Sequence, residues 1–275
     1  MVRRCQPLLG TYVEIIIPNK YSTKQLNHAF HEAFQEIQLI EQLMSFRRPS
    51  SDLSQINQYA FQRQVAVHPY TYEVLSMAKQ LFYETKGAFD CSIGFELQNW
   101  GLLPQIYEDD FLEHGTLRDL DLKMDDSISF RKPLCLDLGG IAKGYGVDKA
   151  IESLASNNIA EAVVNAGGDM RVLGEFAEDI YIKQPLNSHK LIHVGQLSDG
   201  AIATSGIYYS KETSFHQDQS ALVIPCTDQS VLSTQSYSVI AKSCMVADGL
   251  TKALAIHQDV HAQYLNKYGA IGVIL

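Results

Sequence analysis

The strand-forming segments of this chain come in runs, and this order constrains its fold more than any other feature of the sequence. In the second half, apolar and β-branched segments follow one another with few helical stretches between them, at 134–138, 161–165, 170–174, 180–185, 200–205, 221–225, 236–241 and 270–275. A doubly wound sheet requires strands and helices that alternate strictly. The runs therefore predict an α+β fold, and the lack of repeats or linkers predicts one domain over residues 1–275.

Helices are expected around these strands. The first is capped by Ser22 or Thr23 and carries apolar side chains at helical spacing up to Leu43. The second ends at Gly87, because glycine suits the C′ position. The expected bounds are 22–43, 70–86, the glycine-rich turn to 156, and 245–257 for helices, 45–57 for a polar turn, and 101–133 for irregular, acidic surface connections.

A glycine-rich turn separates an apolar segment from a helix, and residues 134–151 there read LCLDLGGIAKGYGVDKAI. Glycine lets a ligand approach the main-chain N–H groups closely, and a helix N-terminus attracts anions such as phosphate. The sequence matches neither the P-loop pattern nor the Rossmann pattern. Tight packing of a helix on a sheet explains such turns about as often as a ligand does. Both interpretations remain open on this turn alone.

Composition narrows the class of protein. The 275 residues carry a net charge of −9 and a sequence pI of about 5.4, which argues against a nucleic-acid-binding surface. Five cysteines, an odd number without a C-x-x-C pair, argue against a disulfide framework or a structural zinc site and favour a reducing compartment.

The N-terminal residues resemble a strand more than a signal peptide. Residues 11–17 read TYVEIII, and they follow two arginines without a long apolar region or a small-residue cleavage site. No stretch approaches the roughly 18 apolar residues that a transmembrane helix needs. We therefore expect a cytoplasmic protein with no transmembrane segment.

Separated segments match one family in the right order along almost the whole chain. They are PLLGTYVEI (7–15), LMSFRRPSSDLSQIN (43–57), GAFDCSIGFELQNWG (87–101), DLGGIAKGYGVDKA (137–150), VVNAGGDMRVLG (163–174), AIATSG (201–206) and SCMVADGLTKAL (243–254). Together they resemble the ApbE family, the FAD:protein FMN transferases. The resemblance implies a single α+β domain related to the T-fold, with mixed or antiparallel sheets, flanking helices and a cleft for FAD.

The resemblance also implies a reaction and its residues. Family members transfer the FMN half of FAD to a Thr or Ser hydroxyl of another protein and release AMP with the help of Mg²⁺. The expected partners are thus FAD and an acceptor flavoprotein subunit, whose identity the sequence does not give. The site residues carried over are Leu9, Phe46, Arg47, Ala88, Phe89, Asp90, Asp137 and Lys143 for the flavin nucleotide, Gly140 and Asp248 for the metal, and His216 for catalysis.

Three parts of the chain depart from the family's pattern. Four residues after Asp248 the family has a metal-binding Thr, whereas this chain has Lys252, which can pair with Asp248 across an exposed helix surface or with a phosphate. The family's H-[IV]-I-D-P-x-T-G segment is replaced by SFHQDQSALVIPCTDQS, which leaves His216 and Asp218 as its counterparts.

The third departure lies in the flavin pocket. Leu9 stands where the family has Met, and Arg47 stands where it has a ring-stacking Tyr, with Phe46 beside it. Two alternatives follow from these departures. One is a flavin-binding protein of the same fold that has lost the transfer activity, and the other is an enzyme that hydrolyses FAD to FMN and AMP.

Overall fold

The computed structural model of the chain describes residues 1–106, 113–185, 187–206, 222–225, 227 and 229–275. In this part of the chain the largest sheet has seven strands in the order β1-β2-β6-β7-β10-β13-β14, and every neighbouring pair is antiparallel. The expectation of an α+β fold with antiparallel sheets is confirmed. The strands are Val2–Leu8 (β1), Thr11–Ile17 (β2), Ala162–Ala166 (β6), Asp169–Leu173 (β7), Gly200–Gly206 (β10), Ser236–Ala241 (β13) and Ile271–Ile274 (β14).

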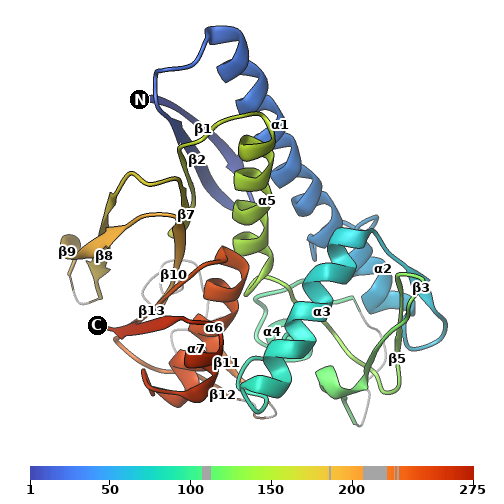
Figure 1. Ribbon diagram of the computed structural model, residues 1–275. Helices are drawn as coiled ribbons and strands as arrows, with labels where there is room; N and C mark the ends of the chain where they lie inside the picture. The colour runs from blue at the N-terminus through green and yellow to red at the C-terminus, as the bar shows by residue number, and fades with distance from the viewer. Residues whose placement is uncertain (107–112, 186, 207–221, 226, 228) are drawn as a thin grey trace.

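Helices cover one face of this sheet. Helix α1 (Thr23–Met44) runs beside α5 (Ala142–Ser156), and α6 (Cys244–His257) continues the layer toward the C-terminal strands (Figure 1). The apolar stripe of α1 and one side of α5 pack against the inward side chains of β2 and β6. The expected helices 22–43 and 245–257 are confirmed within two residues, because a long apolar stripe at helical spacing is a strong signal.

A two-stranded hairpin covers the opposite face. Strands β8 (Glu178–Gln184) and β9 (Asn187–Leu197) project from the large sheet at the left of Figure 1. Ile180 and Ile182 of β8 pack on Val172 and Ile202, so the alternate residues of β8 remain exposed. The hairpin therefore packs one face against the core and turns its other face outward.

The polar segment expected as a turn at 45–57 contains a helix. Residues Asp52–Tyr59 form α2, and Ser51 caps it by accepting a hydrogen bond from the Ser54 amide at 3.0 Å. The sequence SSDLSQIN was misleading because a helix N-terminus is rich in the same small polar residues as a turn. Helix α3 (Pro69–Glu84) follows, and Lys86 rather than Gly87 takes the first left-handed position after it, with φ 55°.

The region expected as irregular at 101–133 also contains structure. It forms a short 3₁₀ helix, Leu117–Asp119, and strands β4 (Leu120–Leu122) and β5 (Ser127–Phe130). Strand β5 pairs with β4 on one side and with β3 (Val65–Ala66) on the other. Leu117, Leu120 and Ile128 are fully buried there. The segment was expected to be irregular because its many acidic residues outnumber these three buried apolar residues. The remaining short elements are α4 (Gly94–Asn99), α7 (Gln263–Lys267), β11 (Val223–Ile224) and β12 (Gln229–Ser230).

The apolar segment 134–138, expected as a strand, joins no sheet. Its main chain is held instead by the side chain of Asn57, which donates to the Leu136 carbonyl and accepts from the Leu136 amide, both at 2.8 Å. The carbonyl of Cys135 accepts from Gly94 at 2.8 Å, and the Asp137 amide donates to Cys91 at 2.8 Å. The segment is as buried as a strand would be and therefore has the same apolar pattern. That pattern does not show that its main-chain hydrogen bonds go to a side chain and to other segments rather than to a neighbouring strand.

Because Asn57 is buried and satisfies two main-chain groups, we expect Asn57→Ala to destabilise the protein strongly. Each buried polar group left without a partner costs about 1–3 kcal/mol. Urea unfolding monitored by circular dichroism measures the loss. The exposed Asn266 in α7 offers a matched control, and Asn266→Ala should leave the stability nearly unchanged. Equal stabilities for the two variants would contradict this role of Asn57.

Candidate functional site

A cavity of about 1050 Å³ opens at one end of the central strands of the large sheet, where β2 and β7 begin and β6 and β10 end. Segments far apart in the sequence meet there: the β1–β2 turn, the loop after α3, the glycine-rich turn before α5, the β6–β7 turn, the β8–β9 hairpin, the end of β10 and one residue of α6. Its lining includes Leu9, Phe89, Asp90, Asp137, Gly139, Gly140, Lys143, Asn165, Gly168, Asp169, Tyr181, Leu191, Thr204, Ser205 and Lys252.

Close packing limits side-chain size at two turns, and at the first of them it requires glycine. A Cβ at Gly167 would lie 2.5 Å from the Thr11 hydroxyl, and this residue also has a left-handed φ of 65°. A Cβ at Gly140 would lie 3.0 Å from Cε of Lys252. The first glycine lets β2 approach the β6–β7 turn, and the second leaves room for the lysine stem. Steric constraints of the fold therefore account for part of the glycine pattern.

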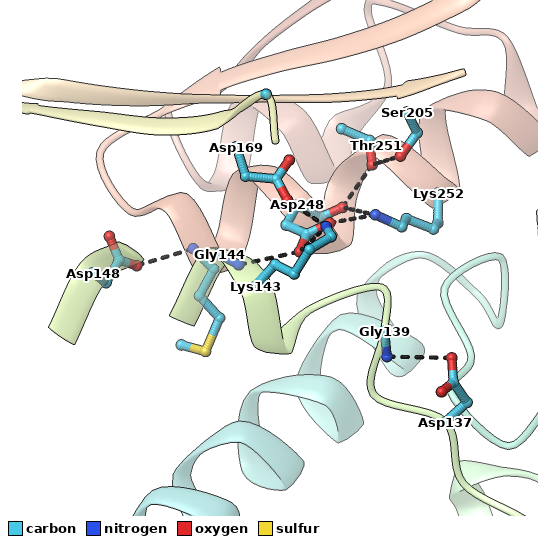
Figure 2. Close-up of polar contacts among 12 residues, drawn as sticks. Asp137, Gly139, Lys143, Gly144, Asp148, Asp169, Ser205, Asp248, Thr251 and Lys252 are labelled. Atoms are coloured by element: carbon cyan, nitrogen blue, oxygen red, sulfur yellow. Dashed lines mark hydrogen bonds and ion pairs between the residues drawn. The ribbon is translucent and has the colours of Figure 1, made fainter. Parts of the chain in front are cut away.

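Two lysines and two aspartates form a connected network beside the cavity (Figure 2). Lys143 pairs with Asp169, and its Nζ lies 3.5 Å from Oδ2 of Asp248. Lys252 pairs with Oδ1 of Asp248, and its Nζ also donates to the Asp248 carbonyl at 3.1 Å. The Gly144 amide, in the first turn of α5, donates to Oδ2 at 3.2 Å. Both carboxylate oxygens of Asp248 are thus engaged by cationic or N–H groups.

The charges in this network stabilise one another. Burial acts to raise the pKa of Asp248, but the ammonium groups of Lys143 and Lys252 outweigh it and hold this pKa below its ordinary value. Burial opposes the charge of Lys143 as well, yet Asp248 and Asp169 raise its pKa. Burial, followed by the charge of Asp248, raises the pKa of Asp169. Lys143 therefore remains an ammonium ion whose position is fixed by two carboxylates.

The N-terminus of α6 is already satisfied within the protein. Asp148 of α5 accepts hydrogen bonds from the amides of Cys244 and Met245, each at 2.9 Å, and from the Ser243 hydroxyl at 2.7 Å. Arg171 pairs with the same carboxylate at 2.7 Å. An anionic ligand in the cavity would consequently meet the glycine-rich turn and the two lysines rather than this helix end.

The structure brings most of the expected site residues together. Leu9, Phe89, Asp90, Asp137, Gly140 and Lys143 line the cavity, and Asp248 lies fully buried behind Lys143 and Lys252. The Asp248–Lys252 pair expected from the spacing is present, but it is buried rather than exposed, with 1% of the Asp248 side chain accessible.

Other expected residues lie elsewhere. Phe46 is buried in the core that includes α2 and α3, and Ala88 is buried in the same core, so neither lines the cavity. Arg47 is exposed and donates to the Leu102 carbonyl at 3.4 Å. His216 falls outside the residues that the structure describes.

Sequence reasoning assigned no role to Asp169 or Thr204, although both lie in matched segments and both line the cavity. Asp169 follows the second pair of glycines, and an acidic residue directly after a glycine turn is a usable signal. The partner of Lys143 was missed because β7 and α5 meet only in the folded protein.

The network does not fit a magnesium ion. Mg²⁺ requires oxygen ligands in near-octahedral geometry, but both carboxylate oxygens of Asp248 are taken by the groups described above. The neighbouring hydroxyl of Thr251 is fully buried, donates to the Asp248 carbonyl at 2.7 Å, and shares a hydrogen bond with Ser205 at 2.8 Å. Within the described ranges, no group of three or more His, Cys, Asp or Glu residues is placed to hold a metal ion.

The carboxyl of Asp90 gives the site a pH-dependent stability. Burial raises its pKa from 3.8 to about 6, against hydrogen bonds from the Ser92 hydroxyl and amide. The folded protein therefore holds this proton more tightly than the unfolded chain, and stability is lost as the pH rises from about 4 to 6. Two pKa units correspond to about 3 kcal/mol at most.

We therefore expect Asp90→Asn to gain stability over the wild type as the pH rises, by up to about 3 kcal/mol at neutral pH and by little at pH 4. Urea unfolding at the two pH values measures the difference. The exposed Asp125, whose pKa is lowered chiefly by a hydrogen bond from Ser127, serves as a control, and Asp125→Asn should show no such gain. A pH-independent effect of Asp90→Asn would contradict the assignment.

The fold and the site together define an α+β protein with a cavity bordered by glycine turns and paired lysines. The chain belongs to the ApbE family, whose model matches residues 9–275. It is 28% identical to the FAD:protein FMN transferase of Vibrio cholerae serotype O1, over 98% of this chain and 85% of that protein. It is 26% identical to the protein of the same name from Haemophilus influenzae, over 90% and 78% of the two chains.

Solved structures of ApbE proteins superpose on almost the whole of this chain. A mutant of the flavin transferase ApbE from Vibrio cholerae superposes with a TM-score of 0.82 at 26% identity, covering 99% of this chain and 92% of that one. The ApbE protein of Thermotoga maritima superposes with a TM-score of 0.84 at 24% identity, covering 99% and 94%. The second likeness bears on the fold alone. In the described parts of this chain, no helix combines the length and the apolar character needed to cross a membrane.

Proposed function

We propose that this chain is an FAD:protein FMN transferase, which moves the FMN moiety of FAD to a Thr or Ser hydroxyl of an acceptor protein and releases AMP. The observation that carries the proposal is the pair of ammonium groups, Lys143 and Lys252, beside the glycine-rich turn in a cavity large enough for a nucleotide. The names of the relatives point to the same reaction.

The reaction needs charge neutralisation more than covalent chemistry. The acceptor hydroxyl attacks the phosphorus on the FMN side of the diphosphate, a new P–O bond forms, and the bond to the bridging oxygen breaks so that AMP leaves. Negative charge on the phosphoryl oxygens must be stabilised by fixed donors. Lys143 and Lys252 are held in place by Asp169 and Asp248 and are suited to this role.

The remaining roles are proposals of the same kind. Leu9 and Phe89 line the cavity and offer apolar contacts for the flavin ring, while Asp90 and Asp137 provide oxygen atoms for polar contacts. His216 is proposed to take the proton of the acceptor hydroxyl. An acceptor flavoprotein subunit is the proposed protein partner.

The residues at Asp248 do not fit magnesium, which the resemblance implies for this reaction. The oxygen atoms of Asp248 and Thr251 are engaged within the protein, so the lysines carry the neutralising charge in the proposed reaction.

We expect the purified protein to bind FAD more tightly than FMN. Both ligands carry the flavin ring, but only FAD carries a diphosphate that the two lysines bordering the cavity can bind. Isothermal titration calorimetry with FAD, FMN and AMP measures the order of affinities. The absence of heat with FAD at roughly tens of micromolar, the range of weak cofactor sites, would contradict the proposed function.

A further inference from the structure

The side chain of Lys252 lies between Gly140 and Asp248, the two positions to which the family resemblance assigned a divalent cation. Its stem passes so close to Gly140 that an added Cβ would lie 3.0 Å from Cε. Its ammonium group contacts both Oδ1 and the carbonyl oxygen of Asp248. The lysine borders the cavity, and 21% of its side chain is accessible. A cationic group of the protein itself therefore stands at this place.

The other groups around Asp248 also exclude a metal ion. Oδ2 faces the ammonium group of Lys143 at 3.5 Å and accepts from the Gly144 amide at 3.2 Å. The hydroxyl of Thr251 is buried and is engaged by Ser205 of β10 and by the Asp248 carbonyl (Figure 2). A divalent cation at Asp248 would have to displace two ammonium groups and would be repelled by them at short range. The carboxylate of Asp248 instead holds the ammonium groups of Lys143 and Lys252 in position.

Each lysine retains a donor for a ligand. An ammonium group has three N–H donors, and the two described contacts of Lys252 both go to Asp248. Lys143 directs its described contacts to Asp169 and Asp248. The third donor of each group is free to meet an anion in the cavity, and the aspartates prevent the side chains from turning away. Two fixed ammonium groups match the two phosphoryl groups of a dinucleotide.

We propose that Lys252 takes the place of the divalent cation, so that this chain binds the diphosphate of FAD through Lys143 and Lys252 without a metal ion. The inference rests on the proposed function, because it concerns the same ligand in the same cavity. The lysines supply the positive charge as fixed ammonium groups, and no metal ligand is needed to complete the site.

The test compares FAD affinities in EDTA and in excess Mg²⁺ by calorimetry, with riboflavin as the ligand that lacks phosphate. The wild type is expected to bind FAD equally well in both solutions. Lys252→Met should lose about tenfold or more in FAD affinity in EDTA, as a lost charge-assisted hydrogen bond implies, and should keep its affinity for riboflavin. Lys242→Met removes an exposed lysine just before α6 and should change neither affinity.

A third variant, Lys252→Thr, is expected to bind FAD weakly in EDTA and to regain affinity in Mg²⁺, since it removes the ammonium group and introduces a hydroxyl ligand. Electron paramagnetic resonance with Mn²⁺ gives a second readout. The free Mn²⁺ signal should persist with wild-type protein and FAD and should decrease with the Lys252→Thr variant.

Several outcomes would overturn the inference. One such outcome is a wild type whose FAD affinity rises about tenfold or more in Mg²⁺. Another is a Lys252→Thr variant whose FAD affinity does not change in Mg²⁺ and which does not bind Mn²⁺. Either outcome would show that Lys252 does not replace the metal. In either case FAD still binds, so the proposed function stands. A different result would overturn the proposed function together with the inference. In that result the wild type binds FAD neither in EDTA nor in Mg²⁺, whether or not it binds riboflavin.

Discussion

Lys143→Ala is expected to weaken FAD binding by about 1–3 kcal/mol, the value of a hydrogen bond to a charged group, and to leave riboflavin binding unchanged. The reason is geometric, because Lys143 lies on the first turn of α5 beside the glycine-rich turn and faces the cavity. Riboflavin carries no phosphate and does not reach this group. Calorimetric titration of both ligands into wild type and variant measures the difference.

The structure also supplies a matched control for this substitution. Lys149 lies on the same helix and pairs with two carboxylates, Glu73 at 3.4 Å and Glu152 at 3.0 Å, but it does not border the cavity. Lys149→Ala should preserve both affinities. Because Lys143→Ala leaves two buried carboxylates with fewer partners, loss of riboflavin binding to the same extent would reveal damage to the fold and would contradict a specific phosphate contact.

Gly144→Ala is expected to destabilise the protein strongly. At this point α5 crosses α6 so closely that an added Cβ would lie 2.3 Å from the Cys244 carbonyl oxygen. Overpacking against backbone, which cannot rotate away, costs about 1–3 kcal/mol or more. The shift would also disturb the Gly144 amide bond to Asp248, so FAD binding should weaken together with stability.

Gly146→Ala is the control, because it lies on the same helix and the only close neighbour of its added Cβ would be the end of the Leu9 side chain, at 3.0 Å, with Ile40 and Ile37 at ordinary contact distances. Alanine gains about 1 kcal/mol of helix propensity over glycine, which offsets a small displacement of Leu9. Thermal unfolding compares the variants. Equal melting temperatures for Gly144→Ala and the wild type would contradict the close α5–α6 crossing.

The parts of the fold that were predictable from sequence are those whose packing follows their own periodicity. Helix α1 shows its buried stripe directly, and β6, β10 and β13 appear as apolar segments. Segment 134–138 has the same apolar character, but its hydrogen bonds go to Asn57 and to loops. Which distant groups satisfy a buried backbone is a property of the tertiary structure, and no local pattern encodes it.

The site was predictable where its residues lie directly beside a glycine-rich turn. Asp137 and Lys143 flank such a turn, and the folded chain places both at the cavity. Phe46 and Arg47 were assigned by alignment to a family position, yet the connection between α1 and α2 places Phe46 in the core and leaves Arg47 at the surface. The spacing of Asp248 and Lys252 predicted their pairing, but only the packing of α6 against β10 and α5 shows that the pair is buried.

The proposed transfer reaction is tested most directly by the molar ratio of AMP to free FMN released from FAD. The protein is incubated with FAD and a cell extract that supplies acceptor proteins, and chromatography quantifies both nucleotides. A transferase is expected to release AMP in excess of free FMN, because FMN remains on a protein hydroxyl. AMP and free FMN in equal amounts would identify hydrolysis, and FAD that remains intact would identify a flavin-binding protein without transfer activity. Either result would contradict the account.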